Sequence, residues 1–207
     1  MQVYNIPTGA LGTNTYLVYD DDSMAGFIVD PGGYASGIAD KIKEMGIDLQ
    51  YIMLTHGHAD HIMGVEGFRE AFPEVKVIAN TNEKEMLGDV SFNMSAQFGQ
   101  PTEIDADIYV DDEDEMEVGG LKLKFFFTPG HSPGGMCIYI PEENTLFSGD
   151  TLFCASIGRT DFPGCSFEAL KKAIHEKLWP LPDETSVFPG HMQPTSIGYE
   201  RENNPFV

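Results

Sequence analysis

The sequence predicts an α/β chain in which two β-sheets pack face to face and helices cover their outer sides. Two observations carry this prediction. Strand-rich stretches form two successive halves, each followed by helical stretches, and His or Asp residues repeatedly follow the predicted strands. At 207 residues the chain is long enough to bury a substantial core. One domain spanning 1–207 accounts for the whole pattern.

The first half alternates short apolar runs with helical patterns. Strands are expected at residues 2–6, 14–20, 25–30, 50–54 and 75–79, and helices at 35–46, 61–72 and 81–88. Residues 89–105 contain Gly, Ser and Asn without a clean period. A stretch of this length without regular structure is typical of a functional loop, so we expect it to cover a site.

The second half begins with an acidic run at 111–115, which predicts a solvated turn rather than a metal site. Ser166 is expected to cap a helix that extends to about Leu178, and Glu168 in its first turn favours the helix dipole. Further strands are expected at 121–127, 136–140, 145–148 and 186–188.

The charge balance restricts the partners of the chain. Its formal net charge is −21, with 33 acidic and 12 basic residues, which argues against a basic surface for nucleic acid. An anionic membrane surface would repel such a chain as well. There is no apolar run long enough to span a bilayer, and residues 1–6 lack the features of a secretory signal. We therefore expect a soluble cytoplasmic protein.

The three cysteines are Cys137, Cys154 and Cys165, an odd number without Cys-x-x-Cys spacing. This argues against a disulfide framework and a zinc ribbon, so reduced thiols are expected. Cys137 lies in an alternating stretch and is expected to pack as a small apolar residue. Cys154 follows the segment Ser148-Gly149-Asp150, which leaves open a position near a site, but a role in chemistry is not expected for it.

The segment from His56 to His61 predicts a metal site. His56, His58, Asp60 and His61 fall within six residues, directly after the apolar run 51–54. A strand leaving a sheet can direct His56 and His58 to one side, while the two later side chains, past a turn, reach in from another direction. One short segment can thus supply ligands to two neighbouring metals. Imidazole and carboxylate together favour Zn, Fe or Mn over Ca or Mg.

The same pattern recurs at other strand ends. Pro-Gly precedes both His131 and His191, and Asp150 follows the strand expected at 145–148. Pro ends strand pairing and Gly permits a sharp turn, so each side chain is presented at the sheet edge. His175 lies inside a predicted helix and is expected at the surface. Seven ligand-type side chains are expected to converge from four strand ends: His56, His58, Asp60, His61, His131, Asp150 and His191.

The motif His56-x-His58-x-Asp60-His61, followed in order by His131, Asp150 and His191, resembles the metallo-β-lactamase-fold hydrolases. Within them it is similar to the short, single-domain glyoxalase II-like proteins. The stretches Gly158–Phe162 and Arg201–Phe206 strengthen this resemblance. The resemblance implies a four-layer αββα sandwich with metals at one edge.

The resemblance also implies a role for each residue of the motif. Two divalent metal ions are implied, with Zn first and Fe or Mn as alternatives. The first would be held by His56, His58 and His131, and the second by Asp60, His61 and His191, with Asp150 as the bridge. Asp60 and Asp150 are then the catalytic residues, together with a metal-bound hydroxide that attacks a carbonyl. A thiolate leaves readily because thiol pKa values are about 8.5.

The implied substrate is a small-molecule thioester such as S-D-lactoylglutathione. Arg159 is a candidate contact because a guanidinium can bind a carboxylate in bidentate fashion, although Asp161 is an obvious partner for it. Gln193 stands where the family places a Tyr that contacts glutathione.

Two alternatives share this fold. The first is a mononuclear-iron persulfide dioxygenase, in which His56, His131 and Asp150 would hold the iron. The second is a hydrolase of lactones or other esters. The motif from His56 to His61 does not separate these activities, and a hydrolase is the favoured prediction.

Overall fold

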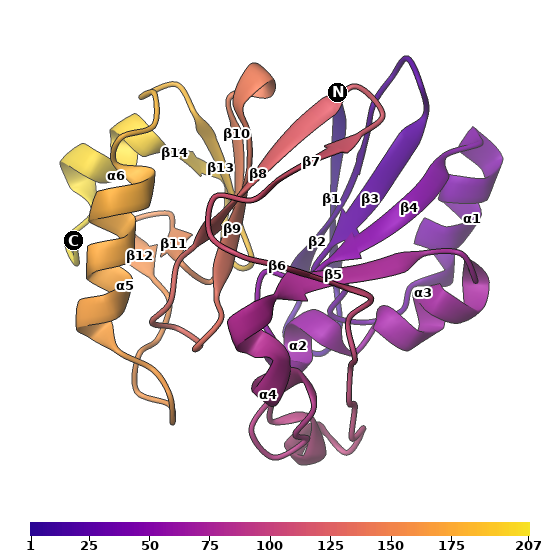
Figure 1. Cartoon of the computed structure of the whole chain (residues 1–207), viewed down its shortest axis with the longest axis horizontal. Coiled ribbons are helices and arrows are strands. Elements are labelled where there is room, and N and C mark those ends of the chain that lie inside the picture. Colours follow the sequence, from indigo (N-terminus) through magenta and orange to yellow (C-terminus); the bar gives the residue numbers. More distant parts are fainter.

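A computed structural model describes residues 1–207 and consists of two six-stranded sheets packed face to face, with helices on both outer sides (Figure 1). The predicted fold class is therefore confirmed. The first sheet contains, in spatial order, β1 (Gln2–Thr8), β2 (Thr13–Tyr19), β3 (Ala25–Val29), β4 (Asp48–Met53), β5 (Lys76–Asn80) and β6 (Ile108–Val110). The second contains, in spatial order, β14 (Thr195–Ser196), β13 (Ser186–Pro189), β10 (Thr145–Gly149), β9 (Met136–Ile140), β8 (Leu121–Phe127) and β7 (Glu115–Val118). A separate hairpin pairs β11 (Leu152–Phe153) with β12 (Ser156–Ile157).

The helices form the outer layers and one end of the sandwich (Figure 1). The first sheet is covered by α1 (Ser36–Met45) and α3 (Val65–Ala71). The second is covered by α5 (Phe167–Ala173), which continues as the π-helix η4 (Ile174–Leu178), and by α6 (Ile197–Asn203). The remaining short helices are α2 (Ala59–Ile62), η1 (Thr81–Glu83), α4 (Lys84–Leu87), η2 (Ser95–Phe98) and η3 (Pro141–Glu143).

Three apolar clusters fill the three interfaces between these four layers. Every residue of β2 is buried, and its successive side chains point to opposite faces. Leu17 packs in the cluster beneath α1 and α3, whereas Tyr16 and Val18 pack in the cluster between the two sheets. The third cluster lies between the second sheet and α5, where Cys137 is buried as predicted.

The prediction of one helix over 61–72 is wrong in detail, because the structure has two helices there, α2 and α3. Gly64 separates them. Its backbone N–H donates to the carbonyl of Pro31 (2.8 Å), and a Cβ at this position would lie 2.6 Å from the carbonyl carbon of Gly33. The helix break therefore allows the loop after β3 to approach the backbone closely.

Several short elements were not predicted, namely β6, β7, β11, β12, β14, α6, η2 and η3. The acidic turn expected over 111–115 ends at Asp114, because Glu115 begins β7 and pairs with Lys124 of β8. Ser166 caps α5 as predicted, since its hydroxyl accepts a hydrogen bond from the N–H of Ala169 (3.2 Å).

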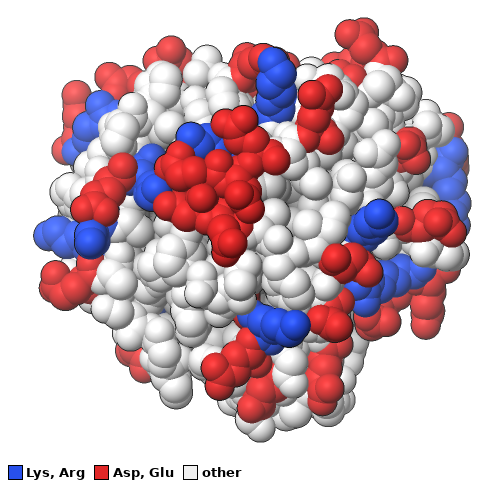
Figure 2. All heavy atoms as spheres, in the orientation of Figure 1, with Lys and Arg blue, Asp and Glu red and all other residues white.

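No helix of the protein combines the length and the apolar character that crossing a bilayer requires. Figure 2 shows one compact acidic patch and further acidic groups around the edges of this face, with basic side chains scattered among them. On this face the basic residues do not form a continuous stripe, in agreement with the net charge of −21.

Candidate metal centre

All seven predicted ligand-type side chains lie in the segments that follow four strands. The parallel strands β10 and β13 are neighbours, so their carboxyl ends meet at the same edge and bring Asp150 close to His191. His131 follows β8 of the same sheet, and the segment from His56 to His61 follows β4 of the first sheet and enters α2. The site therefore straddles both sheets.

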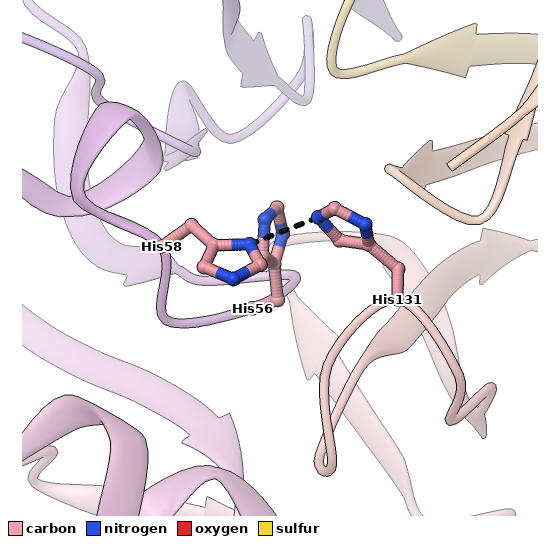
Figure 3. Close-up of side chains that lie close together, drawn as sticks. All are labelled: His56, His58 and His131. Carbon is pink, nitrogen blue, oxygen red and sulfur yellow. Dashed lines mark hydrogen bonds between the residues drawn. The ribbon is translucent and has the colours of Figure 1, made fainter. Parts of the chain in front are cut away.

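His56, His58 and His131 form the first cluster, and their ligand atoms lie within 4.8 Å of one another. The His58 Nδ1 and His131 Nε2 atoms are 2.9 Å apart. Figure 3 shows the three imidazoles pointing toward a common point from two separate loops. All three residues are buried.

The surroundings keep the imidazoles of His56 and His58 neutral. Burial, reinforced by the neighbouring imidazoles, holds the pKa of His56 well below its ordinary value. The same causes lower the pKa of His58 to about 3. Neutral imidazole is the form that binds a metal, so these two side chains are ready to act as ligands at neutral pH.

Asp60, His61 and His191 form the second cluster, and their ligand atoms also lie within 4.8 Å of one another. The Asp60 Oδ2 atom is 3.1 Å from His191 Nε2 and 3.6 Å from His61 Nε2. Burial alone would raise the pKa of Asp60, but the two imidazoles hold it well below its ordinary range. The hydrogen bond from His191 to Asp60 raises the pKa of His191.

His61 differs from the imidazoles of the first cluster because carboxylates surround it. Burial opposes a charge on His61, but the carboxylates of Asp60, Asp150 and Asp30 outweigh burial and raise its pKa to about 10. In the metal-free protein, the second cluster therefore holds a proton at neutral pH.

Asp150 lies between the two clusters. Its Oδ1 atom is 3.5 Å from His61 Nε2, and its Oδ2 atom is 3.5 Å from His131 Nε2 and 3.8 Å from His191 Nε2. Tetrahedral ligands bound at about 2.0–2.1 Å are separated by roughly 3.3 Å, which is close to these spacings. The carboxylate is therefore within reach of a cation in either cluster.

Buried ligand atoms without partners test whether a metal fits this site. The Nε2 atoms of His56 and His61 and the Oδ1 atom of Asp150 are buried and make no hydrogen bond. An orphaned buried polar atom is destabilising, and a cation bound in each cluster would give these atoms a partner. The residues therefore fit a metal centre.

Asp30 orients the second cluster, and it was not among the predicted site residues. Its carboxylate accepts hydrogen bonds from His61 Nδ1 (2.9 Å) and from the N–H (2.8 Å) and hydroxyl (2.6 Å) of Thr55. This leaves His61 Nε2 to face the cluster. A signal was present in the sequence, because Asp30 ends an apolar strand just before Pro31 and Gly32, as the predicted ligands end theirs.

Two further contacts orient ligands from outside the clusters. His131 Nδ1 donates to the backbone carbonyl of Arg159 (2.8 Å), which leaves Nε2 for the first cluster. Asn14 Nδ2 donates to the carbonyls of Pro189 (3.0 Å) and Met192 (2.8 Å), on either side of His191. Sequence reasoning missed Asn14, since it gives no local signal of a contact with residues so distant in the chain.

A pocket of about 270 Å³ opens onto both clusters. Its apolar lining residues are Leu11, Met94, Phe98, Phe153 and Phe162. Met94 and Phe98 belong to the loop predicted over 89–105 to cover a site, and they lie where that prediction expects them.

Arg159 also lines this pocket, where Asp161 pairs with it. Two hydrogen bonds of 2.9 and 2.8 Å join the guanidinium to the carboxylate, and the guanidinium carbon lies 4.2 Å from the ring centre of Phe162. Both charged side chains are mostly exposed. The sequence left open whether Arg159 pairs with Asp161 or contacts substrate, and the structure shows the pair.

Other predicted residues fall outside the clusters. His175 is exposed on η4, as expected. Cys154 is half-buried beside the pocket residue Phe153, and Gln193 Nε2 donates to its sulfur (3.3 Å).

Buried His and Asp clusters at the strand ends of an αββα sandwich define a metal-binding protein of the metallo-hydrolase kind. Residues 8–191 match the model of the metallo-beta-lactamase superfamily. The chain belongs to this superfamily and is a hydrolase with His and Asp metal-binding clusters.

Relatives cover the whole chain. It is 38% identical to the probable metallo-hydrolase YqgX of Bacillus subtilis, over all of this chain and 98% of that protein. It is 35% identical to the hydroxyacylglutathione hydrolase GloC of Haemophilus influenzae, with the same coverage.

Solved structures show the same fold. BLEG-1, described as a B3 metallo-beta-lactamase, superposes with a TM-score of 0.92 at 40% identity over 99% of both chains. TTHA1623 in a di-iron-bound form superposes with a TM-score of 0.85 at 31% identity, over 99% of this chain and all of that one.

Proposed function

We propose that this protein is a dinuclear metal-dependent thioester hydrolase of the glyoxalase II type. The observation that carries the proposal is the position of Asp150, whose carboxylate approaches His131 of the first cluster as well as His61 and His191 of the second. In this assignment His56, His58 and His131 would hold one cation, Asp60, His61 and His191 would hold the other, and Asp150 would serve both. Zinc is the metal we propose first. Iron is the alternative supported by the di-iron form of TTHA1623, and manganese suits the same ligands.

The protein positions the reaction through its ligand side chains. When bound, two divalent cations supply Lewis acidity and lower the pKa of a shared water toward neutrality. Asp150 would offer its carboxylate to both positions, and Asp60 turns its carboxylate toward His61 and His191. Asp30 and the carbonyl of Arg159 hold the outer nitrogens of His61 and His131, so the inner nitrogens face the reacting centre.

The pocket favours a leaving group that needs no proton. Apart from the proposed ligands, its only ionisable lining residue is Arg159, which remains protonated at neutral pH. No side chain in the pocket is thus placed to act as a general acid for a poor leaving group. A thiolate departs without such help because thiol pKa values are about 8.5. Together with the full-length similarity to GloC, this supports a hydroxyacyl thioester such as S-D-lactoylglutathione as the substrate.

A β-lactam is the second candidate substrate. The similarity to BLEG-1, at 40% identity, favours it. The apolar side chains that line the pocket, including Phe98 and Phe153, are compatible with either substrate.

The deciding experiment is hydrolysis of S-D-lactoylglutathione by metal-loaded protein, with the His131→Ala variant as control. We expect loss of the thioester absorbance with wild type and no turnover with the variant. A chromogenic cephalosporin is assayed in parallel with the same two proteins. Cephalosporin cleavage without thioester cleavage would replace the proposal with a β-lactamase. Oxygen uptake with glutathione persulfide, again without thioester cleavage, would replace it with the dioxygenase alternative.

A further inference from the structure

Glu83 is a buried carboxylate that has no place among the proposed ligands. It closes η1, the short helix after β5, and only 1% of its surface is exposed. Burial raises its pKa to about 7, against the opposing effect of backbone N–H groups that donate to it. A buried carboxyl group is destabilising unless it is hydrogen-bonded, so the partners of Glu83 are informative.

The two carboxylate oxygens of Glu83 accept hydrogen bonds from two different loops. Oε1 accepts from the backbone N–H of Gly57 (2.7 Å), and Oε2 accepts from that of Gly134 (2.5 Å). Gly57 lies between His56 and His58 in the chain, and Gly134 lies three residues after His131. One side chain therefore joins the two loops that supply the whole first cluster, and these loops come from opposite sheets.

The glycines allow this close approach. A Cβ on Gly134 would collide with the backbone nitrogen of Glu83. A Cβ on Gly57 would lie 3.1 Å from the side chain of Met86 and 3.3 Å from Glu83 Oε1. The loop of Gly134 thus packs against η1, and the loop of Gly57 packs against α4. Neither loop can move away without breaking a hydrogen bond to the Glu83 carboxylate.

We propose that Glu83 is a positioning residue that fixes the loops of His56–His58 and His131 relative to each other, and so pre-organises the first cluster before metal binds. This proposal rests on the proposed dinuclear centre. The contact of His58 with His131 across the sandwich is then held by the chain itself rather than by the cation. Outer contacts of this kind typically change metal affinity by about 10- to 100-fold.

The test is the Glu83→Gln variant, because Gln presents one oxygen and one NH₂ group where two backbone N–H donors point. One of the two bonds must be lost. We expect the affinity for one of two metal ions, measured by chelator competition, to fall about 10- to 100-fold, while the other affinity changes less than about twofold. Excess metal is expected to restore turnover of the variant.

Glu200→Gln is the matched control. Glu200 is equally buried, and it accepts hydrogen bonds from Ala155, Thr195 and Asn204, none of which is a proposed ligand. We expect this variant to lose stability but to keep both metal affinities. Unchanged affinities in both variants, or equal losses in both, would overturn the positioning role. A wild type that binds fewer than two metals would instead overturn the dinuclear centre on which the proposal rests.

A second measurement needs no variant and applies if Glu83→Gln does not fold. In chelated wild-type protein, the amide hydrogens of Gly57 and Gly134 are expected to exchange slowly with solvent, at rates that added metal changes less than about tenfold. Rapid exchange of these amides without metal would contradict pre-organisation by Glu83.

Discussion

The two clusters are built from similar side chains, yet they differ in charge before any metal binds. In the first cluster, His56 and His58 are buried among imidazoles, and their pKa values are lowered. In the second, carboxylates surround His61 and raise its pKa to about 10. His56 and His58 are therefore neutral and able to bind a cation, whereas the second cluster already holds a proton on His61. Neighbouring charges, rather than ligand type, set this difference.

The largest expected effect comes from removing the residue that joins the two clusters. Asp150→Ala deletes the carboxylate that approaches both, and with it a negative charge that balances two cations. We expect both metals to be lost and turnover to fall by more than about 100-fold, since the loss should exceed that of an outer contact. Metal analysis and thioester turnover on the same sample check this.

The control for that substitution is His175→Ala, on the exposed surface of η4. It should alter neither metal content nor turnover. Unchanged turnover in Asp150→Ala would contradict the dinuclear assignment, and the two clusters would then be independent sites.

The next effect tests the difference in protonation. Because the pKa of His61 in the metal-free protein is about 10, a cation entering the second cluster must displace its proton throughout the neutral range. Affinity there should rise about tenfold per pH unit between pH 6 and 8, whereas His56 and His58 release no proton in the first cluster. Calorimetry in two buffers of different ionisation enthalpy measures the protons released. Equal proton release on binding of both metals would contradict the predicted difference in protonation between the two clusters.

The same shifts act in opposite directions on the stability of the metal-free fold. The raised pKa of His61 contributes stability that is fully present below pH 6.5 and is lost as the pH rises through about 10. The lowered pKa values of His56 and His58 oppose folding in acid, because the unfolded chain takes up protons below pH 6.5. Chelated protein should therefore lose stability on both sides of neutrality, which denaturation at several pH values would show.

The smallest effect is expected at the mouth of the pocket. Arg159 fixes His131 through its backbone carbonyl, which Arg159→Ala retains, while its exposed side chain pairs with Asp161. Exposed ion pairs are weak, so we expect KM for an anionic thioester to rise less than about tenfold, with kcat and metal content unchanged. Steady-state kinetics measures this, with Arg201→Ala as a control in which another surface ion pair, to Asp183, is removed. Loss of metal from the first cluster would contradict the expectation that the Arg159 carbonyl can hold His131 without the Arg159 side chain.

Most of the fold and the ligand set could be predicted because their signals are local. Alternating apolar residues mark strands such as β8, and the close spacing from His56 to His61 marks a metal site. The elements that were not predicted, or were predicted wrongly, have physical causes. Strands of two to four residues, such as β7, have too few side chains to show a period, and the break at Gly64 is caused by a loop that is distant in sequence.

The supporting residues were harder to predict than the ligands. Asp30 and Glu83 act through partners 25 to 51 residues away, and nothing in their immediate sequence specifies those partners. The protonation of His61 was likewise beyond local patterns, because it depends on three carboxylates that only the fold brings together.

The placement of the clusters across both sheets has a consequence for the lifetime of the protein in a cell. A cation that binds only the folded state, between ligands from both sheets, stabilises that state. When the free metal concentration is a thousandfold above Kd, it adds about 4 kcal/mol to the unfolding free energy. Starved of metal, the same polypeptide opens more often and is exposed to proteolysis more often. Because the clusters lie between the two sheets, the rate at which the chain is degraded would depend on whether metal is bound. The amount of this protein in the cell would then follow the supply of its cation.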